Sequence, residues 1–203
     1  MAVITKRSLI LLILTAVLLI TFVSGCAGDP ATADPDLYIV PQVEDGILVN
    51  GNREGYPGKP LTVAGLEVLM AHDGSILYLY VRSETDGWIA QGFNKQGGGM
   101  DGANILIGYF KEDGSQALRN DLGQGKTHAE TINGVLEHHI LREDSGVIME
   151  LAYPLDFPDE AGFNLPGLSP GEEEVYTLIA AFANTHDPNQ LHSRFGLADF
   201  SLE

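Results

Sequence analysis

The stretch "LTVAGLEVLMAHDGSILYLYVR" (residues 61–82) contains the clearest fold signal in the chain. Two runs rich in aliphatic, aromatic and β-branched residues, at 61–71 and 75–82, flank the pair Asp73-Gly74. An Asp-Gly pair tolerates the positive φ angles of a tight turn, and runs of this composition are typical of strands. The stretch therefore predicts two strands joined as a β-hairpin.

The same combination of short apolar runs and turn-forming pairs recurs along most of the chain. Further runs predict strands at 88–93, 103–110, 135–141, 147–153 and 175–183. Turn-forming pairs lie at Asp45-Gly46, Asn50-Gly51, Asp86-Gly87, Asp113-Gly114 and Asn133-Gly134. A long pattern with the helical period of 3.6 residues is absent. We therefore predict an all-β fold, an immunoglobulin-like antiparallel β-sandwich of roughly ten strands.

The N-terminal segment has the pattern of a secretory signal. Lys6 and Arg7 precede an apolar run at 8–23, and the small residues Ser24 and Gly25 follow it. The run is shorter than the about 20 apolar residues that span a bilayer. The small residues before Cys26 resemble the lipobox of bacterial lipoproteins, which implies that Cys26 becomes the acylated N-terminus of the mature chain.

These features predict a simple domain organisation. We expect a lipoprotein signal peptide at 1–25, a lipidated N-terminus and tether at 26–36, and one β-sandwich domain at 37–203. The expected location is extracytoplasmic, with the domain anchored to the cell membrane by lipid. Cys26 is the only cysteine, so an internal disulfide is impossible and the apolar core must stabilise the domain.

The charge of the chain limits its partners. The formal net charge is −17 at pH 7, which disfavours binding to nucleic acid. An acidic surface favours transient docking of a basic protein partner instead.

The segment "DGWIAQGFNKQGGGMDGANILIGYF" (86–110) carries the most specific motif. It contains Gly-Trp-x-Ala-x-Gly-Phe, then a glycine-rich loop, then Met-x-Gly-Ala before an apolar run, and in this it resembles the DOMON family. Four further stretches follow the order usual in that family: "DGILVNGNREGYP" (45–57), "GQGKTHAE" (123–130), "MELAYPLD" (149–156) and "LIAAFANTHDPNQLHSRFG" (178–196). The first of them resembles the strand with which prokaryotic members begin. The resemblance covers almost the whole of the expected domain.

The resemblance implies a β-sandwich that holds a ligand between loops at one edge. Many members bind haem b, and others bind sugars. In the haem-binding cytochrome branch the axial ligands correspond here to Met100 and His192. A thioether and an imidazole are a known axial pair, and the thioether raises the reduction potential. A Cys-x-x-Cys-His motif is absent, which excludes covalent attachment of a c-type haem.

Several other residues are candidates for the same site. Gly98, Gly99 and Gly102 would let the backbone approach a flat macrocycle. Trp88 is expected in the sandwich beside this loop, and Arg194 could pair with a haem propionate.

The choice of histidine stays open, because His128 is an alternative ligand or a supporting partner. His138 and His139 are adjacent in an expected strand and therefore point to opposite faces. Asn104 stands where the family usually has an aspartate, and an asparagine can replace hydrogen bonds of that aspartate but not its charge.

The expected function is electron transfer by a b-type haem, in partnership with an unidentified redox protein. Catalysis would reside in that partner, since the chain shows neither Gly-x-Ser-x-Gly nor His-Glu-x-x-His. The alternative is a module that binds a sugar or another small ligand without redox activity, with Trp88, Tyr109 and Phe110 as stacking residues. A further alternative is an assembly domain without a ligand.

Overall fold

The computed structural model describes residues 31–32, 37–131, 133–144, 146–156, 168–170 and 174–203. The expected signal peptide and Cys26 lie outside the described residues. Thirteen strands are present among them, more than the roughly ten that the turn spacing suggested. Within the described residues, no helix has the length and apolar character that crossing a membrane would require.

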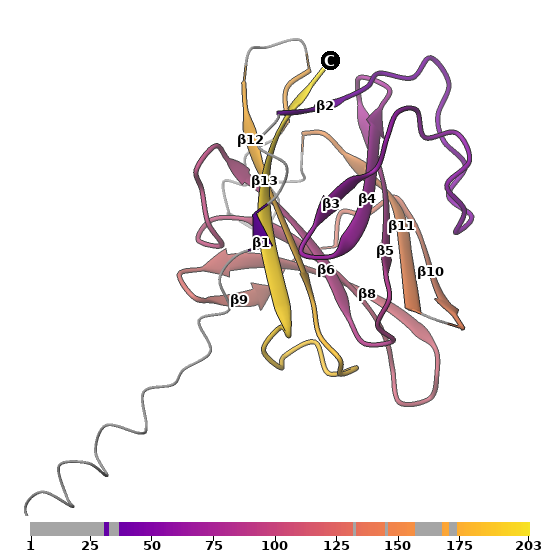
Figure 1. Cartoon of the computed structure of the whole chain (residues 1–203), viewed down its shortest axis with the longest axis vertical. Helices are drawn as coiled ribbons and strands as arrows, with labels where there is room; N and C mark the ends of the chain where they lie inside the picture. The colour runs from indigo at the N-terminus through magenta and orange to yellow at the C-terminus, as the bar shows by residue number, and fades with distance from the viewer. Residues whose placement is uncertain (1–30, 33–36, 132, 145, 157–167, 171–173) are drawn as a thin grey trace, which may run out of the picture.

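The strands form two sheets packed face to face, which confirms the predicted all-β sandwich (Figure 1). All pairings are antiparallel except those of β1 and β2 with β13. The eight-stranded sheet has the order β1 (Ala31–Thr32), β13 (Arg194–Leu202), β12 (Tyr176–Phe182), β6 (Ile89–Lys95), β7 (Asn104–Phe110), β8 (Gln116–Gln124) and β9 (Thr127–Glu130), with β2 (Tyr38–Val40) also beside β13. The five-stranded sheet has the order β10 (Glu137–Glu143), β11 (Gly146–Pro154), β5 (Ile76–Ser83), β4 (Leu66–His72) and β3 (Leu61–Val63).

Part of the segment expected to be a tether belongs to the eight-stranded sheet. Ala31 and Thr32 pair in parallel with Gly196 and Leu197 of β13. Their pairing brings the start of the described chain to the edge of that sheet.

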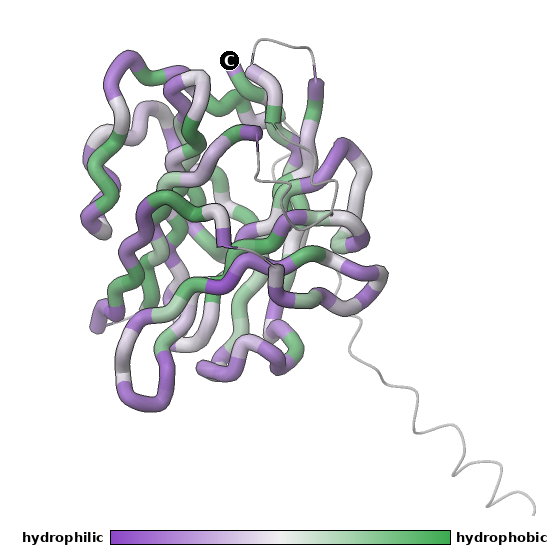
Figure 2. The backbone as a smooth tube through the Cα atoms, turned by 180° about the vertical axis from the view of Figure 1, so that it is seen from behind, coloured by the Kyte–Doolittle hydropathy of each residue, from purple (hydrophilic) through white to green (hydrophobic). Residues whose placement is uncertain are grey.

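The main core lies between the two sheets. Along each strand, side chains alternate between this core and the outer face, as the period of two requires. Phe93, Leu106, Met149 and Phe200 are among the fully buried core residues. Figure 2 shows the resulting contrast between hydrophobic stretches in the strands and hydrophilic residues in many connecting loops.

Asn104 also points into this core, where its amide donates to the hydroxyl of Tyr153 at 2.8 Å. An ionised aspartate could only accept at this position, so the neutral amide suits the buried location.

The hairpin predicted at Asp73-Gly74 is confirmed. It joins β4 to β5, Gly74 has a φ of 92°, and the Asp73 carboxylate accepts the backbone N–H groups of Ser75 and Ile76 at 2.9 and 2.8 Å. The prediction of one strand over 61–71 is wrong. This run is itself a hairpin of β3 and β4.

Ala64 and Gly65 form the turn of that additional hairpin. Their φ angles are 57° and 86°, and positive φ at both central residues is the requirement of a type I′ turn. Alanine is uncommon in such turns, so in the sequence only Gly65 indicates this turn.

Residues 45–57, expected to form a strand, contain none and instead cover the outer face of the five-stranded sheet. Ile47 and Val49 pack there against Tyr78 of β5. Glu150 of β11 is fully buried beneath the segment, and its Oε2 accepts the N–H groups of Asn50 and Gly51 at 2.7 and 2.5 Å. Backbone N–H groups of the segment thus donate to a carboxylate, whereas those of a strand would donate to the carbonyl groups of a neighbouring strand.

Candidate functional site

The outer face of the eight-stranded sheet carries a second apolar cluster, which we call the outer patch. Ala90 of β6, Ile105 and Ile107 of β7 and Ala181 of β12 alternate with residues of the main core, so they face away from the five-stranded sheet. Ile107 is only 1% exposed, whereas the residues that pack against the buried members are partly exposed. The buried members are Trp88, Ala90, Ala103, Ile105, Ile107, Ala181 and Ala183, and Met100, Tyr109, Ile179 and Phe195 pack against them.

The loop of Met100 joins β6 to β7 at one end of the outer patch. Gly97 and Gly102 have φ angles of 71° and 77°, in the region that favours glycine. The buried amide of Asn94 donates to the carbonyls of Gly99 and Asp101 at 2.8 and 2.9 Å. These two bonds hold the loop on either side of Met100.

Met100 itself is partly buried and packs against the outer patch. Its backbone lies directly over Gly123 of β8, where a Cβ would stand 1.7 Å from the Met100 carbonyl oxygen and 3.3 Å from its Cγ. The N–H of Gly102 donates to the carbonyl of Gly123 at 2.9 Å. Met100 therefore depends on a glycine in β8 that the motif at 86–110 does not include.

The glycines predicted as ligand contacts have separate structural roles. A Cβ on Gly98 would lie 2.6 Å from Cγ of Asn94, so Gly98 makes room for that amide. Gly102 is required by its φ angle. A Cβ on Gly99 or on Gly102 would meet no atom within 4 Å, so both positions face open space.

His192 lies in the loop that joins β12 to β13, at the opposite end of the outer patch from the Met100 loop. The strand register shows this, because Asn94 beside the Met100 loop pairs with Thr177, whereas Phe182 at the other end of β12 pairs with Ile89. The His192 ring packs on Phe195, with 5.0 Å between ring centroids. Burial lowers the pKa of His192, a hydrogen bond to its own backbone opposes this shift, and electrostatic interaction with His128 lowers the pKa further, so the two imidazoles lie within electrostatic reach.

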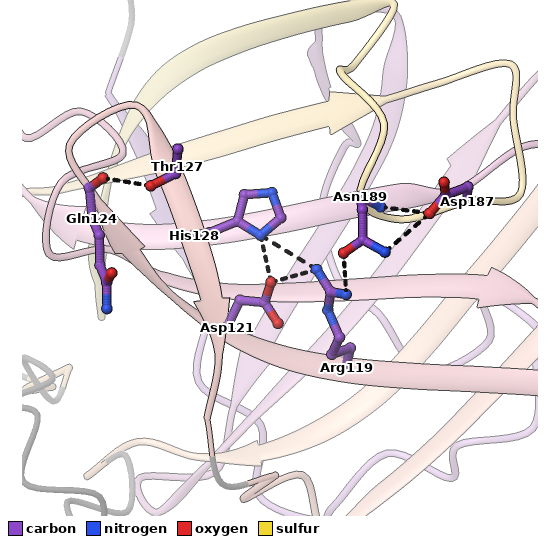
Figure 3. Close-up of polar contacts among 7 residues, drawn as sticks. All are labelled: Arg119, Asp121, Gln124, Thr127, His128, Asp187 and Asn189. Carbon is purple, nitrogen blue, oxygen red and sulfur yellow. Dashed lines mark hydrogen bonds and ion pairs between the residues drawn. The ribbon is translucent and has the colours of Figure 1, made fainter.

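Figure 3 shows a polar network that joins residues of β8 and β9 to residues of the His192 loop. Arg119 donates through Nη2 to Oδ2 of Asp121 at 2.7 Å and through Nη1 to Oδ1 of Asn189 at 2.9 Å. His128 forms a short contact through Nδ1 with the same oxygen of Asp121. Asn189 belongs to the His192 loop, so this network ties that loop across the sheet to β8.

Three buried polar atoms around the patch have no hydrogen-bond partner within the described part of the chain. They are Nε1 of Trp88, Nε of Arg119 and Oδ1 of Asp121. Buried polar atoms are nearly always paired, so atoms of this kind indicate where a water or a polar group of a ligand binds.

The structure brings Met100, Trp88, His128 and His192 to one face. The expectation that Trp88 lies beside the glycine-rich loop is wrong, because Trp88 precedes β6 and its N–H donates to the carbonyl of Thr185 at the other end of the patch. The structure does not bring Arg194 to that face. Side chains alternate along β13, so Phe195 lies on the outer face and Arg194 on the opposite face. Nη1 of Arg194 lies 3.3 Å from the position of a Cβ on Gly65, in the turn between β3 and β4. Arg119 is the basic residue that the site contains.

Sequence reasoning missed Arg119 and Asp121 because β8 has few apolar residues to mark it as a strand. The available signal was their spacing of two residues, which places both side chains on one face of a strand.

The remaining candidates lie elsewhere. His139 faces Gly51 on the five-stranded sheet, and His72 is fully buried at the end of β4. Phe110 belongs to the main core with the Arg142 guanidinium 4.6 Å above its ring, and Trp88 is 4% exposed, so neither offers a free face for stacking. Among the described residues, no three His, Cys, Asp or Glu side chains form a group that could hold a metal ion.

Comparisons with known proteins give matches to solved structures only. No family model matches the chain, and no curated protein matches it. The chain is similar to the cytochrome domain of Myriococcum thermophilum cellobiose dehydrogenase, with 17% identity, 70% of this chain and 77% of that chain covered, and a TM-score of 0.46.

It is also similar to a family 9 carbohydrate-binding module from Caldicellulosiruptor kristjanssonii solved in complex with cellotriose. The identity is 11%, the alignment covers 83% of this chain and 95% of that chain, and the TM-score is 0.42. At sequence identities and TM-scores this low, the two similarities do not indicate which ligand this chain binds.

Proposed function

We propose that the protein is an extracytoplasmic electron-transfer domain that holds one haem b on the outer patch, with Met100 and His192 as axial ligands. The observation that carries the proposal is the placement of these two residues at opposite ends of one apolar surface. Met100 and His192 would hold the haem iron from the two loops that border the patch.

The residues of the site fit the requirements of haem. Both ligands are neutral when they bind, since Met100 offers a thioether and the pKa of His192 is lowered by burial. Ala90 and Ala181, two small residues of the outer patch, pair directly across β6 and β12. When bound between a thioether and an imidazole, haem iron supplies one-electron transfer at a raised potential.

The proposed setting follows from the N-terminal pattern and the charge. Lipid on Cys26 would keep the domain at the membrane surface. The net charge of −17 would favour transient docking of a basic redox partner, in which any catalysis would take place.

The first experiment is an absorption spectrum of the mature domain, expressed with haem available, before and after dithionite. We expect a sharp low-spin b-type spectrum on reduction. Met100→Ala should leave the fold intact, lower the reduction potential and speed the loss of haem to an acceptor protein. Leu191→Ala, an exposed change in the His192 loop, is the control.

Two results would count against this function. A colourless protein that takes up no added hemin would exclude haem binding. An unchanged potential in Met100→Ala would remove Met100 from the ligands while leaving haem binding itself in place.

A small polar ligand such as a sugar is the second candidate. The three unpartnered polar atoms of Trp88, Arg119 and Asp121 favour it, because sugar hydroxyls could pair with them. Calorimetric titration of the haem-free protein with oligosaccharides tests this function. Heat of binding that disappears in Tyr109→Ala would support it, and absence of heat with soluble cello- and xylo-oligosaccharides would argue against it.

A further inference from the structure

We infer that His128 is a second ligand for the coordination position of Met100, held ready by Asp121 and Arg119. The inference rests on the proposed haem site and names a residue that would regulate its ligation. It follows from three features: how the ring is oriented, how its partner is fixed, and where it lies relative to Met100.

The His128 ring is oriented by its Nδ1 atom. Nδ1 contacts Oδ2 of Asp121, and a carboxylate oxygen accepts hydrogen bonds, so Nδ1 carries the hydrogen and donates it. The described contacts of the ring with Asp121 and Arg119 both use Nδ1 (Figure 3). Nε2 of a neutral ring then keeps its lone pair, and no described residue forms a hydrogen bond with it.

A carboxylate on the far nitrogen is the usual support of a histidine that ligates metal. It fixes the tautomer and makes Nε2 a stronger donor to the metal. By contrast, the His192 ring packs on Phe195 and hydrogen-bonds to its own backbone, and within the described part of the chain it forms no ion pair with a carboxylate.

Asp121 is itself firmly held. Its side chain is fully buried, and Arg119, whose side chain is 12% exposed, balances its charge through the 2.7 Å ion pair. Both residues lie on β8, which pairs with β7 over seven residue pairs. Asp121 and Arg119 are therefore positioning residues, since they would act on iron only through His128.

His128 lies on the same side of the site as Met100. It pairs directly with Gly123, and Gly123 is the residue on which the Met100 backbone rests. Directly paired residues have Cβ positions about 5 Å apart, so His128 and Met100 are neighbours separated by a glycine that has no side chain. Two neighbours on one side cannot ligate iron from opposite faces, so they would compete for one position opposite His192.

The test uses the mature domain loaded with hemin, and electron paramagnetic resonance reports the spin state of ferric iron. In Met100→Ala we expect iron to stay low-spin with a bis-imidazole signal, while the near-infrared band of thioether ligation disappears. In the double variant Met100→Ala/His128→Ala we expect high-spin iron and loss of haem about 10- to 100-fold faster than in Met100→Ala. Met100→Ala/His186→Ala, which removes an exposed histidine of the His192 loop, should remain low-spin.

A conservative change tests the positioning role of Asp121. In the Met100→Ala background, Asp121→Asn should convert part of the low-spin signal to high-spin. In haem-free protein, nitrogen NMR should show His128 protonated at Nδ1, and Asp121→Asn should shift it towards a mixture of tautomers. Circular dichroism confirms that each variant is folded.

The outcomes separate this inference from the proposed function. Low-spin iron in the unmodified protein with high-spin iron in Met100→Ala, or low-spin iron in the double variant, would overturn the role of His128 alone. Failure of the unmodified protein to take up hemin would overturn the proposed function and this inference with it.

Discussion

The loop of Met100 in the candidate site depends on Asn94, a residue that is not itself a candidate ligand. Its amide holds the carbonyls of Gly99 and Asp101, and so keeps the loop of Met100 against β8. The amide needs space that only a glycine at position 98 leaves free. The glycine-rich motif is therefore explained first by the packing of its own loop.

Asn94→Ala should loosen this loop. Two net hydrogen bonds of about 1 kcal/mol each would be lost, so we expect the free energy of unfolding to fall by about 2 kcal/mol. Urea unfolding measures that change, and hydrogen exchange should show faster exchange at residues 97–103. Gln124→Ala, an exposed change at the end of β8, should alter neither. Equal exchange in the two variants would show that Asn94 does not hold the loop.

At the scale of elements, the two sheets cover their outer faces by different means. Residues 45–57 lie over the five-stranded sheet, bound to Glu150 through the N–H groups of Asn50 and Gly51. The loops of Met100 and His192 border the outer patch of the eight-stranded sheet, and the Arg119–Asn189 bond draws the second loop across it. A face covered only by loops can bind a ligand more readily than one covered by a segment bonded to a buried carboxylate.

Gly51→Ala should detach the segment over the five-stranded sheet. Gly51 has a φ of 85°, and its Cβ would lie 2.3 Å from Cδ1 of Leu141 and 2.7 Å from Cδ2 of His139. We expect a loss of about 2–4 kcal/mol in the free energy of unfolding, from backbone strain of about 1–2 kcal/mol and overpacking.

Gly58→Ala is the matched control for that change. Gly58 has nearly the same φ, 86°, but no atom lies within 4 Å of the new Cβ. It should cost only the strain of about 1–2 kcal/mol. Equal losses in the two variants, measured by denaturant unfolding, would show that close packing at Gly51 contributes nothing.

At the scale of the whole molecule, stability rests on the main core and on a few buried polar groups. Burial raises the pKa of Glu150 above its ordinary value, although the N–H groups of Gly51 and Asn50 oppose the shift. A carboxyl group with a raised pKa binds its proton more tightly in the folded protein than in the unfolded chain. Its contribution to stability is therefore greatest at low pH and decreases as the pH rises from its unfolded pKa to its folded pKa.

Glu150→Gln should remove this part of the pH dependence. As the pH rises above the ordinary pKa of a glutamate, the unmodified protein should lose stability relative to the variant, with a slope of up to about 1.4 kcal/mol per pH unit for one proton. The difference between the two proteins, measured by denaturant unfolding at several pH values, isolates Glu150 from the many surface acids. A constant difference across this range would contradict the raised pKa.

The sequence by itself determined the all-β class, the turn at Asp73-Gly74 and the position of Met100 in the loop before an apolar strand. These features depend on residues close together in the chain, on alternation and on which residues accept positive φ. The turn at Ala64-Gly65 was missed because its first residue lacks the usual side chain, and β8 because its outward residues are polar.

Only the tertiary structure decided which residues share the site. Met100, His128 and His192 are far apart in sequence, and their meeting depends on the pairing of β6 with β12 and of β8 with β7 and β9. A shift of register by one residue would turn Asp121 and His128 to the opposite face. Backbone pairing between distant strands sets that register, which is why Arg119 joined the site and Arg194 did not.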